Sequence, residues 1–471
     1  MSTLFTCALA RQKINHQTDG EYYAVLTFNP PAMTGAERAP IDVTVAMDVS
    51  GSMGGGKLDS AKKSLLKLVE HLTDKDRLGV VAFESSVEVV FNPLSMTAAN
   101  KKEASQKIKG MRTLGGTNLS GGVLQALSLL KDNPSGKETV RRALAFTDGQ
   151  ANEGVSNADA LCALVSEHRA RIPVSTFGYG NDHDPVLLGK LAQDGSFYFI
   201  DTPDKILTAF GQELGGLIST YAQNVEVRLE PAEGVEILEV LNDLTVTKDG
   251  DAAVIRCDDL LAEQPYNVVV KLKVGKRDNA FPRDTTLVRA KAKFFDLVAK
   301  KQVEEPGTIK VRFVKPGEED TKDNESLSEH IALQLLGQSA REAEKKAQAG
   351  DFMGARAVLM LVREYSCTSG VNIAADILNM ADGLANEAYG SQALYANGGS
   401  HTSNAVSKGI SRQRAAMAGG KVGGVDFDAK YGTKAQANVA KDFEAAPKVV
   451  TDVPVKPTTS GSFEKRRSSH S

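Results

Sequence analysis

The sequence predicts an α/β protein in which a doubly wound, mostly parallel sheet is inserted in, or followed by, an antiparallel β-sandwich, with a small helical segment and a disordered tail after it. Three observations lead to this prediction. Residues 41–220 alternate apolar runs with helical patterns, and residues 224–315 hold runs in which apolar and polar residues alternate. From residue 390 onward, Gly, Ser, Ala, Asn and Lys dominate. The length of 471 residues fits about two to four domains.

The N-terminal segment predicts two strands, at residues 5–14 and 22–28. The second is rich in aromatic and β-branched residues, which favour strands. Pro30 and Pro31 then interrupt regular structure. Because such a hairpin has no place in a doubly wound sheet, we expect residues 1–38 to pair with the sandwich, so that the α/β domain is an insertion.

The α/β domain is expected over residues 41–220. Its first strand, residues 41–48, is a valine-rich run typical of a parallel strand buried on both faces. The helix after it has apolar residues on one stripe, which are Leu58, Ala61, Leu65, Leu68 and Leu72. Asp184 and Thr202 each precede a proline and are expected to cap the following helices. Further strands are expected at residues 77–83, 87–91, 140–147, 172–177 and 196–200, and further helices at 98–111, 119–130, 158–169, 185–192 and 204–220.

The remainder of the chain divides into three predicted parts. Residues 224–315 alternate along most of their apolar runs, which is typical of a half-buried antiparallel sheet and favours a β-sandwich. Residues 326–388 predict two or three helices that pack on the sandwich. Residues 395–471 are predicted to be mostly disordered because hydrophobic residues become sparse there.

Composition excludes several kinds of protein. The net charge of −3 gives no strong attraction to nucleic acid or to an anionic membrane. Residues 1–10 lack the basic segment of a secretory signal, and no apolar run of about 18 residues predicts a membrane span. The four cysteines, Cys7, Cys162, Cys257 and Cys367, form no C-x-x-C zinc pattern. We therefore expect free thiols and a reducing, cytoplasmic location.

Three segments place oxygen-bearing side chains where a strand ends or a helix begins. A D-x-S-x-S segment at residues 48–52 follows the first strand, Thr117 precedes a helix, and Asp148 follows the strand at 140–147. Because ligands bind beyond the carboxyl ends of the strands in such sheets, these pieces are expected to converge. Oxygen ligands suit hard cations such as Mg²⁺. Taken alone, the first segment also fits a strand-to-helix turn whose side chains cap the helix.

The combination resembles the metal-ion-dependent adhesion site of the von Willebrand factor type A family, in which D-x-S-x-S is followed by a threonine and then an aspartate. All five positions match, and they are Asp48, Ser50, Ser52, Thr117 and Asp148. The resemblance implies a Rossmann-like sheet and a bound Mg²⁺ or Mn²⁺. It implies that Ser50, Ser52 and, with ligand bound, Thr117 contact the metal directly, and that Asp48 and Asp148 act mostly through water. It also implies that the metal bridges to a carboxylate of another protein.

The order of the parts supplies a second resemblance. Together with residues 172–184 and 209–217, it resembles a group that includes plant ubiquitin ligases of the RING type and related bacterial A-domain proteins. This resemblance covers roughly residues 1–320. A RING requires a Cys/His zinc module, which four scattered cysteines cannot form. We therefore expect no ubiquitin ligase activity.

The expected function is a metal-dependent protein–protein interaction module. Two carboxylates approximately neutralise a divalent cation, which can still accept an acidic oxygen from a partner's Asp or Glu. Two alternatives stay open: an adaptor or assembly scaffold that works without metal, and a Mg²⁺-dependent phosphohydrolase. The hydrolase is disfavoured because Ser50 stands where a second acid is usual, no His, Lys or Cys lies beside the motif in sequence, and Lys57 has the wrong spacing for a phosphate loop. We therefore expect no enzyme activity.

A second polar cluster lies at residues 181–184, where Asp182, His183 and Asp184 follow one another. These side chains are potential metal ligands. A solvated loop in which Asp184 caps the next helix is the simpler interpretation. The basic end of the chain, Lys465 to Arg467, is expected to be a solvated tail. The sequence does not indicate which oligomeric state the protein adopts.

Overall fold

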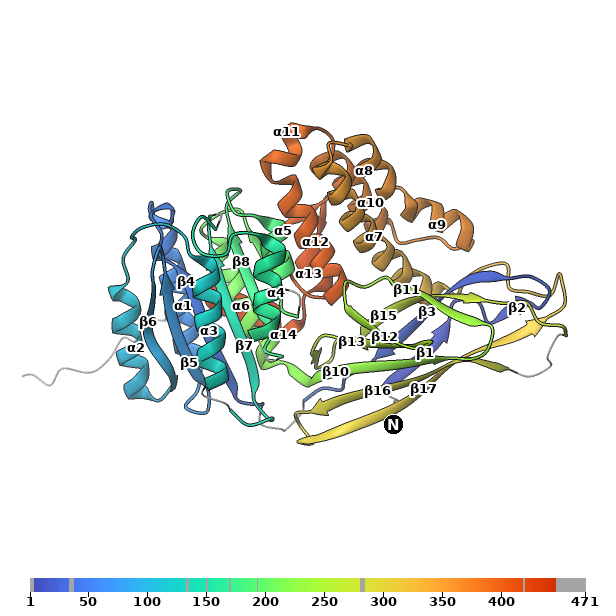
Figure 1. Cartoon of the computed structure of the whole chain (residues 1–471), viewed down its shortest axis with the longest axis horizontal. Helices are drawn as coiled ribbons and strands as arrows, with labels where there is room; N and C mark the ends of the chain where they lie inside the picture. The colour runs from blue at the N-terminus through green and yellow to red at the C-terminus, as the bar shows by residue number, and fades with distance from the viewer. Residues whose placement is uncertain are drawn as a thin grey trace, which may run out of the picture.

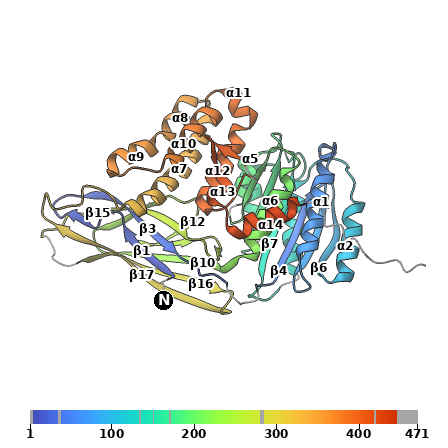
Figure 2. The same ribbon diagram turned by 180° about the vertical axis from the view of Figure 1, so that it is seen from behind.

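The computed structural model describes residues 4–33, 38–132, 135–149, 151–168, 171–192, 194–279, 284–417 and 420–445. Within these ranges the chain forms an α/β domain, a β-sandwich and a helical segment (Figure 1). The α/β domain and the sandwich lie end to end along the long axis of the molecule, and the helical segment covers the junction between them. The view from behind shows α14 lying across the α/β domain (Figure 2).

The α/β domain is built on a six-stranded sheet. In spatial order the strands are β6 (Val87–Ser95), β5 (Arg77–Phe83), β4 (Ile41–Asp48), β7 (Val140–Thr147), β8 (Val174–Tyr179) and β9 (Phe197–Ile200). Neighbouring strands are parallel, except that β5 and β6 are antiparallel. Every residue of β4 is buried, as expected for the centre of a sheet covered on both faces.

Helices cover both faces of this sheet. One face carries α1 (Lys57–His71), α2 (Ala98–Gly110) and α6 (Lys205–Ile218), and the other carries α3 (Leu119–Asp132), α4 (Ala158–His168) and α5 (Pro185–Leu191). A short 3₁₀ turn, η1 (Gly51–Met53), separates β4 from α1. Asp184 caps α5 by accepting hydrogen bonds from two backbone N–H groups, as predicted. The predicted cap at Thr202 is wrong, because α6 begins only at Lys205 and the Thr202 hydroxyl donates to Asp201 instead.

The sandwich consists of two sheets that enclose a second hydrophobic core. One sheet has the order β1 (Phe5–Leu9), β3 (Gly20–Phe28), β15 (Tyr266–Val274) and β11 (Val235–Val240). The other has the order β12 (Thr245–Asp249), β13 (Ala252–Arg256), β10 (Thr220–Pro231), β16 (Thr285–Asp296), β17 (Lys301–Val314) and β2 (Lys13–Asn15), and β14 (Leu260–Leu261) pairs with β10. Pairs are antiparallel except for β2 with β17.

The α/β domain is inserted between strands of this sandwich. β3, which precedes the domain, pairs along its whole length with β15, which follows it. β2 joins the opposite sheet through β17, so the N-terminal segment contributes to both layers. The predicted fold class, a mostly parallel α/β sheet together with an antiparallel sandwich, is therefore confirmed.

The helical segment is larger than the sequence suggested. It contains α7 (Glu325–Gln348), α8 (Phe352–Leu359), α9 (Leu361–Ser369), α10 (Ala375–Gly383), η2 (Leu384–Ala388), α11 (Gln392–Leu394), η3 (Tyr395–Gly399), α12 (Ser400–Arg412), α13 (Phe427–Tyr431), α14 (Lys434–Glu444) and a small hairpin of β18 (Lys421–Val422) and β19 (Val425–Asp426). None of the helices in the described ranges is long and apolar enough to cross a membrane.

The prediction of a disordered tail from residue 395 is wrong for the described residues up to 445. α12 packs on α7 and α5, and α14 packs on α6. The composition was misleading because the small residues there allow close packing rather than indicate disorder. Ala405, Val406 and Ile410 of α12 are fully buried. The predicted tail also includes residues 446–471, which lie outside the described residues.

Candidate functional site

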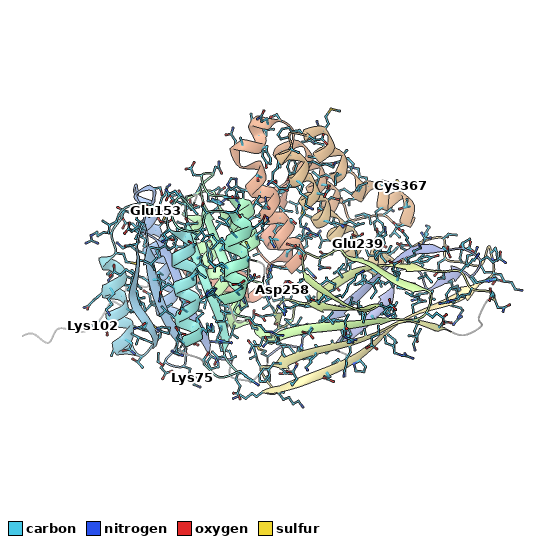
Figure 3. All side chains as sticks on the ribbon, in the orientation of Figure 1. Lys75, Lys102, Glu153, Glu239, Asp258 and Cys367 are labelled. Carbon is cyan, nitrogen blue, oxygen red and sulfur yellow. The ribbon has the colours of Figure 1, made fainter. Side chains whose placement is uncertain are left out.

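The candidate site lies where the two central strands of the α/β sheet end. β4 ends at Asp48, and β7 ends at Thr147, immediately before Asp148. These strands are parallel neighbours, so their carboxyl ends meet at the same edge of the sheet. Figure 3 shows this edge at the top of the α/β domain, where Glu153 is labelled, whereas Lys75 marks the opposite edge.

The carboxylate of Asp48 is completely buried and accepts two hydrogen bonds. Its Oδ1 accepts from the backbone N–H of Ser50 at 2.8 Å, and its Oδ2 accepts from the hydroxyl of Thr147 at 2.5 Å. Burial raises the pKa of the Asp48 carboxyl above its usual value, because removal from water penalises the charged form. A cation nearby would offset this cost.

A chain of hydroxyl groups connects the D-x-S-x-S segment to Asp148. The Oγ atoms of Ser50 and Ser52 are 2.9 Å apart, and the Ser52 hydroxyl donates to Oδ1 of Asp148 at 2.7 Å. Thr117 joins the cluster: a Cβ placed on Gly149 would lie 3.7 Å from Ser52 Oγ and 3.8 Å from Thr117 Oγ1. The structure thus brings all five predicted residues to one edge of the sheet, while their role as metal ligands stays a prediction.

Backbone contacts hold Thr117 at this edge. Its N–H donates to the side chain of Asn152 at 2.8 Å, and its carbonyl accepts from the backbone N–H groups of Asn152 and Glu153 at 3.3 Å each. The carbonyl of Gly115 accepts the N–H of Gly51 at 3.2 Å. Asn152 and Glu153 were missed in the sequence, because their loop approaches Thr117 only after β7 has paired with β4.

Lys57 supplies a positive charge to the site. Its Nζ lies 2.5 Å from Oδ2 of Asp148 and 5.3 Å from the ring centre of Tyr179. The Asp148 side chain is fully buried, and that of Lys57 is 26% exposed. No lysine lies beside the motif in sequence, but Gly55 and Gly56, both at positive φ, turn the chain so that Lys57, the first residue of α1, faces the site.

The residues at this edge fit a hard divalent cation. They combine two carboxylates with three hydroxyls, and oxygen ligands are those that Mg²⁺ and Mn²⁺ prefer. Across the described part of the chain, no group of three or more His, Cys, Asp or Glu side chains is placed to hold a metal. Metal binding here would therefore depend on the hydroxyls of Ser50, Ser52 and Thr117 as well as on the two carboxylates.

The second predicted cluster, at residues 181–184, is a loop after β8, and the predicted exposure to solvent holds for Asn181 and Asp182 but not for His183. The ring of His183 is only 2% exposed, and its centre lies 4.5 Å from that of His401 on α12. The burial of His183 was not predicted, because α12, which packs against it, was expected to belong to the disordered tail. Asp184 is engaged as the cap of α5.

Comparisons with known proteins agree with this fold. A family model described as the von Willebrand factor type A domain matches residues 42–212, a range that contains all five predicted site residues. The structure named "von Willebrand factor type A from Catenulispora acidiphila" has a TM-score of 0.66 at 18% identity and covers 82% of this chain and 89% of that one. The ArnB paralog VWA2 from Sulfolobus acidocaldarius has a TM-score of 0.59 at 15% identity and covers 86% and 99%. At these identities the likeness concerns the fold alone.

The matches to proteins of similar sequence cover 77% or less of the length of each relative described next. The uncharacterized protein sll0103 of Synechocystis is 25% identical over 338 residues, which are 68% of this chain and 77% of that protein. The E3 ubiquitin-protein ligase WAV3 of Arabidopsis thaliana is 24% identical over 51% of this chain, and the match spans only 32% of the ligase. The human inter-alpha-trypsin inhibitor heavy chain H3 is 29% identical over 34% of this chain and 19% of its own length.

Proposed function

Because the chain contains a von Willebrand factor type A domain, we propose that it is a metal-dependent protein-interaction module. The partner would present an Asp or Glu side chain to Mg²⁺ or Mn²⁺ at the carboxyl edge of the α/β sheet. The observation that supports this most strongly is the convergence of two carboxylates and three hydroxyls at that edge. The residues that would hold the cation are Asp48, Ser50, Ser52, Thr117 and Asp148.

The charges of the site favour an acidic partner. When bound, a divalent cation offers an electrophilic position that an oxygen from outside can occupy. Asp48 and Asp148 offset its charge, whereas the hydroxyl ligands add none and leave the position attractive to a carboxylate. Asp48 is fixed in orientation by the N–H of Ser50 and the hydroxyl of Thr147, so the site is organised before a partner arrives.

Calorimetric titration of Mg²⁺ and Mn²⁺ into the metal-free protein tests the proposal. We expect saturable binding to the wild type and none to Asp48→Ala. Asp59→Ala is the matched control, because Asp59 lies on α1 with its side chain 74% exposed. Saturable binding to Asp48→Ala would place the metal elsewhere, and absence of binding to the wild type would contradict metal dependence.

A second candidate function, an adaptor or assembly scaffold that works without metal, is favoured by the ion pair between Lys57 and Asp148. The ammonium group already offsets one of the two carboxylates. The two functions differ in their response to a chelator. Partner binding by a scaffold would persist in EDTA, whereas binding by the metal-dependent module would be lost.

We also propose that the chain binds rather than catalyses. Aspartate-based phosphoryl transfer usually places a second acid two residues after the nucleophile, and this chain has Ser50 at that position. Turnover of phosphate esters with Mg²⁺, lost in Asp48→Ala, would contradict this part of the proposal.

A cytoplasmic location is proposed on the basis of the thiols. Cys7, Cys257 and Cys367 are free thiols, as expected for a reducing compartment. Burial raises the pKa of Cys7 to about 12 and also raises that of Cys257, so neither thiol is activated. Mass spectrometry of the protein from its native source, after thiol alkylation, checks this: a disulfide among the four would contradict it.

A further inference from the structure

A groove opens beside the candidate site, between β5, β6 and the end of α2. Its volume is about 490 Å³. Apolar side chains line it, and they are Val49, Ala82, Val90, Met111 and Leu114. Leu114 is 61% exposed, whereas Ala82 and Met111 are each 7% exposed and form the floor. The groove therefore presents an uncovered apolar wall to the solvent, and such surfaces mark interaction sites.

The groove is continuous with the candidate site because the same loops build both. Val49 lies between Asp48 and Ser50 in the chain, and its carbonyl accepts the N–H of Leu114 at 2.7 Å. The loop that begins at Leu114 leads directly to Thr117. Neighbouring strands lie about 4.8 Å apart and an extended chain advances about 3.3 Å per residue, so an extended peptide that reaches the site enters the groove within about three residues.

Charged residues also line the groove and indicate a protein partner. Glu84 and Glu88 come from β5–β6, and Lys107 and Arg112 come from the end of α2. The guanidinium of Arg112 donates to three backbone carbonyls at that end, which holds it in place. An apolar centre with a charged rim is typical of protein-binding surfaces. Lys107 pairs with Glu103 at 2.9 Å, so Arg112 is the cation that would complement a segment that carries acidic residues.

We propose that this groove binds a large apolar side chain of the same partner segment whose acidic residue is recognised at the candidate site. The partner would carry an extended sequence in which Asp or Glu lies within about three positions of Leu, Ile, Phe or Met. This inference rests on the proposed function, and it adds the second feature that would distinguish one acidic segment from another. The acidic residue supplies metal dependence, and the apolar residue supplies selectivity.

A displayed library of random peptides tests the inference. The library is incubated with the full-length protein in Mn²⁺, and bound peptides are eluted with EDTA. We expect the eluted peptides to combine an acidic residue with a large apolar one at the predicted spacing. The same selection is carried out on Leu114→Ser, which alters an exposed side chain, and on Val90→Thr, which keeps the side-chain shape. We expect both variants to retain the acidic preference and to lose the apolar one.

Titrations with individual peptides measure how much the apolar residue contributes to affinity. Replacing the apolar residue of a selected peptide by Ser should weaken binding to the wild type about tenfold or more, as expected for loss of one buried large side chain. The same replacement should have little effect on binding to Leu114→Ser. Titration of Mn²⁺ alone into Leu114→Ser should match the wild type, which would show that the variant keeps its site.

The outcomes separate this inference from the function on which it rests. If EDTA elutes no peptides from the wild type, both the proposed function and the groove are contradicted. If EDTA elutes acidic peptides without apolar preference, the metal-dependent function stands and the groove inference fails. If removal of residues 446–471 strengthens peptide binding, those residues occupy the groove, and the assignment to a partner is overturned.

Discussion

Asp48 and Asp148 are buried carboxylates at the same edge of the sheet, and they have different interaction partners. Asp148 pairs with Lys57, whereas Asp48 accepts hydrogen bonds from Ser50 and Thr147. Burial raises the pKa of Asp48, so its ionised form is costly in the metal-free protein. A carboxyl group placed where its ionised form is costly is expected to act in binding rather than in stability.

The Asp48→Asn substitution separates the contribution of the Asp48 charge to metal binding from its contribution to stability. The amide keeps the shape of the side chain, can accept from Ser50 and can donate to the hydroxyl of Thr147, while the buried charge is removed. We expect metal binding to be lost and the thermal midpoint of the protein in EDTA to stay equal or to rise, by about 1 kcal/mol or less in the free energy of unfolding. Differential scanning calorimetry measures this, with Asp59→Asn as control. A markedly lower midpoint in EDTA would show that the Asp48 charge stabilises the fold.

Lys57 is expected to compete with a cation for Asp148. In Lys57→Met the buried carboxylate of Asp148 loses its partner, so the metal-free protein should lose about 1–3 kcal/mol of stability. Mg²⁺ should bind about tenfold more tightly, because no ammonium group has to be displaced. Calorimetric titration and thermal unfolding, each with and without Mg²⁺, measure both effects.

Lys67→Met is the matched control for this substitution. Lys67 also lies on α1 and pairs with Glu70, whose side chain is 62% exposed. It should change neither metal affinity nor stability appreciably, since exposed ion pairs contribute little. Weaker metal binding in Lys57→Met than in wild type would mean that Lys57 orients Asp148 for the cation rather than competing with it.

The convergence of the five candidate residues at one edge of the sheet could be predicted from sequence because topology determines where they lie. Asp48 and Asp148 end adjacent parallel strands, and Thr117 begins a helix at the same edge. Lys57, Asn152 and Glu153 could not be predicted, because their contacts depend on the path of loops and not on the ends of strands or helices. A lysine as the first residue of the helix after the motif was the available signal for Lys57.

At the scale of elements, the contact between α6 and α14 depends on glycine. A Cβ on Gly211 would lie 2.6 Å from Cα of Ala440, and a Cβ on Gly215 would lie 2.6 Å from Cα of Gln436. The two helix backbones therefore approach each other where side chains are absent. This contact is also why composition misled the prediction of the tail, since α14 needs few large apolar residues to pack closely.

Gly215→Ala tests this contact, and Gly216→Ala is its matched control on the same helix. A Cβ on Gly215 meets backbone, so α14 must shift, and we expect a loss of about 1–3 kcal/mol in the free energy of unfolding. A Cβ on Gly216 would lie 3.7 Å from the side chain of Gln436, an ordinary contact, so the better helix propensity of alanine should leave stability equal or about 0.5–1 kcal/mol higher. Chemical denaturation measures both. Equal effects of the two substitutions would contradict the close contact.

At the scale of the whole molecule, a turn of the sandwich binds the other two parts through buried ion pairs. Asp259 lies 3.1 Å from Arg142 of β7, and Asp258 lies 2.6 Å from Arg412 of α12. Arg142 also lies 3.6 Å from Glu213 of α6. The inserted arrangement could be predicted because the N-terminal hairpin had no place in the α/β sheet. The long-range ion pairs could not be predicted, because nothing local in the sequence specifies them.

Two buried histidines join the α/β domain to the helical segment and make their contact sensitive to acid. The backbone carbonyl of His183 lies 3.1 Å from Nε2 of His401. Burial, and then the nearby His401, lowers the pKa of His183 to about 3, against the opposing effects of the backbone at Tyr179 and Gly180. Burial also lowers the pKa of His401, against the opposing effects of the His183 carbonyl and of the charges of Asp184 and Asp182.

These lowered pKa values predict that stability falls as the pH falls below the ordinary histidine value of 6.5. Between the folded and unfolded pKa values the unfolded chain binds more protons, so each unit of acidification favours unfolding. We expect His183 to account for a loss of about 1 kcal/mol between about pH 7.5 and pH 5.5. His183→Phe, which keeps an aromatic ring among Phe197 and Phe199, should remove that part of the loss, whereas His168→Gln, at an exposed histidine, should not. Denaturation at the two pH values measures this, and equal acid sensitivity of wild type and His183→Phe would show that this contact does not carry the pH dependence.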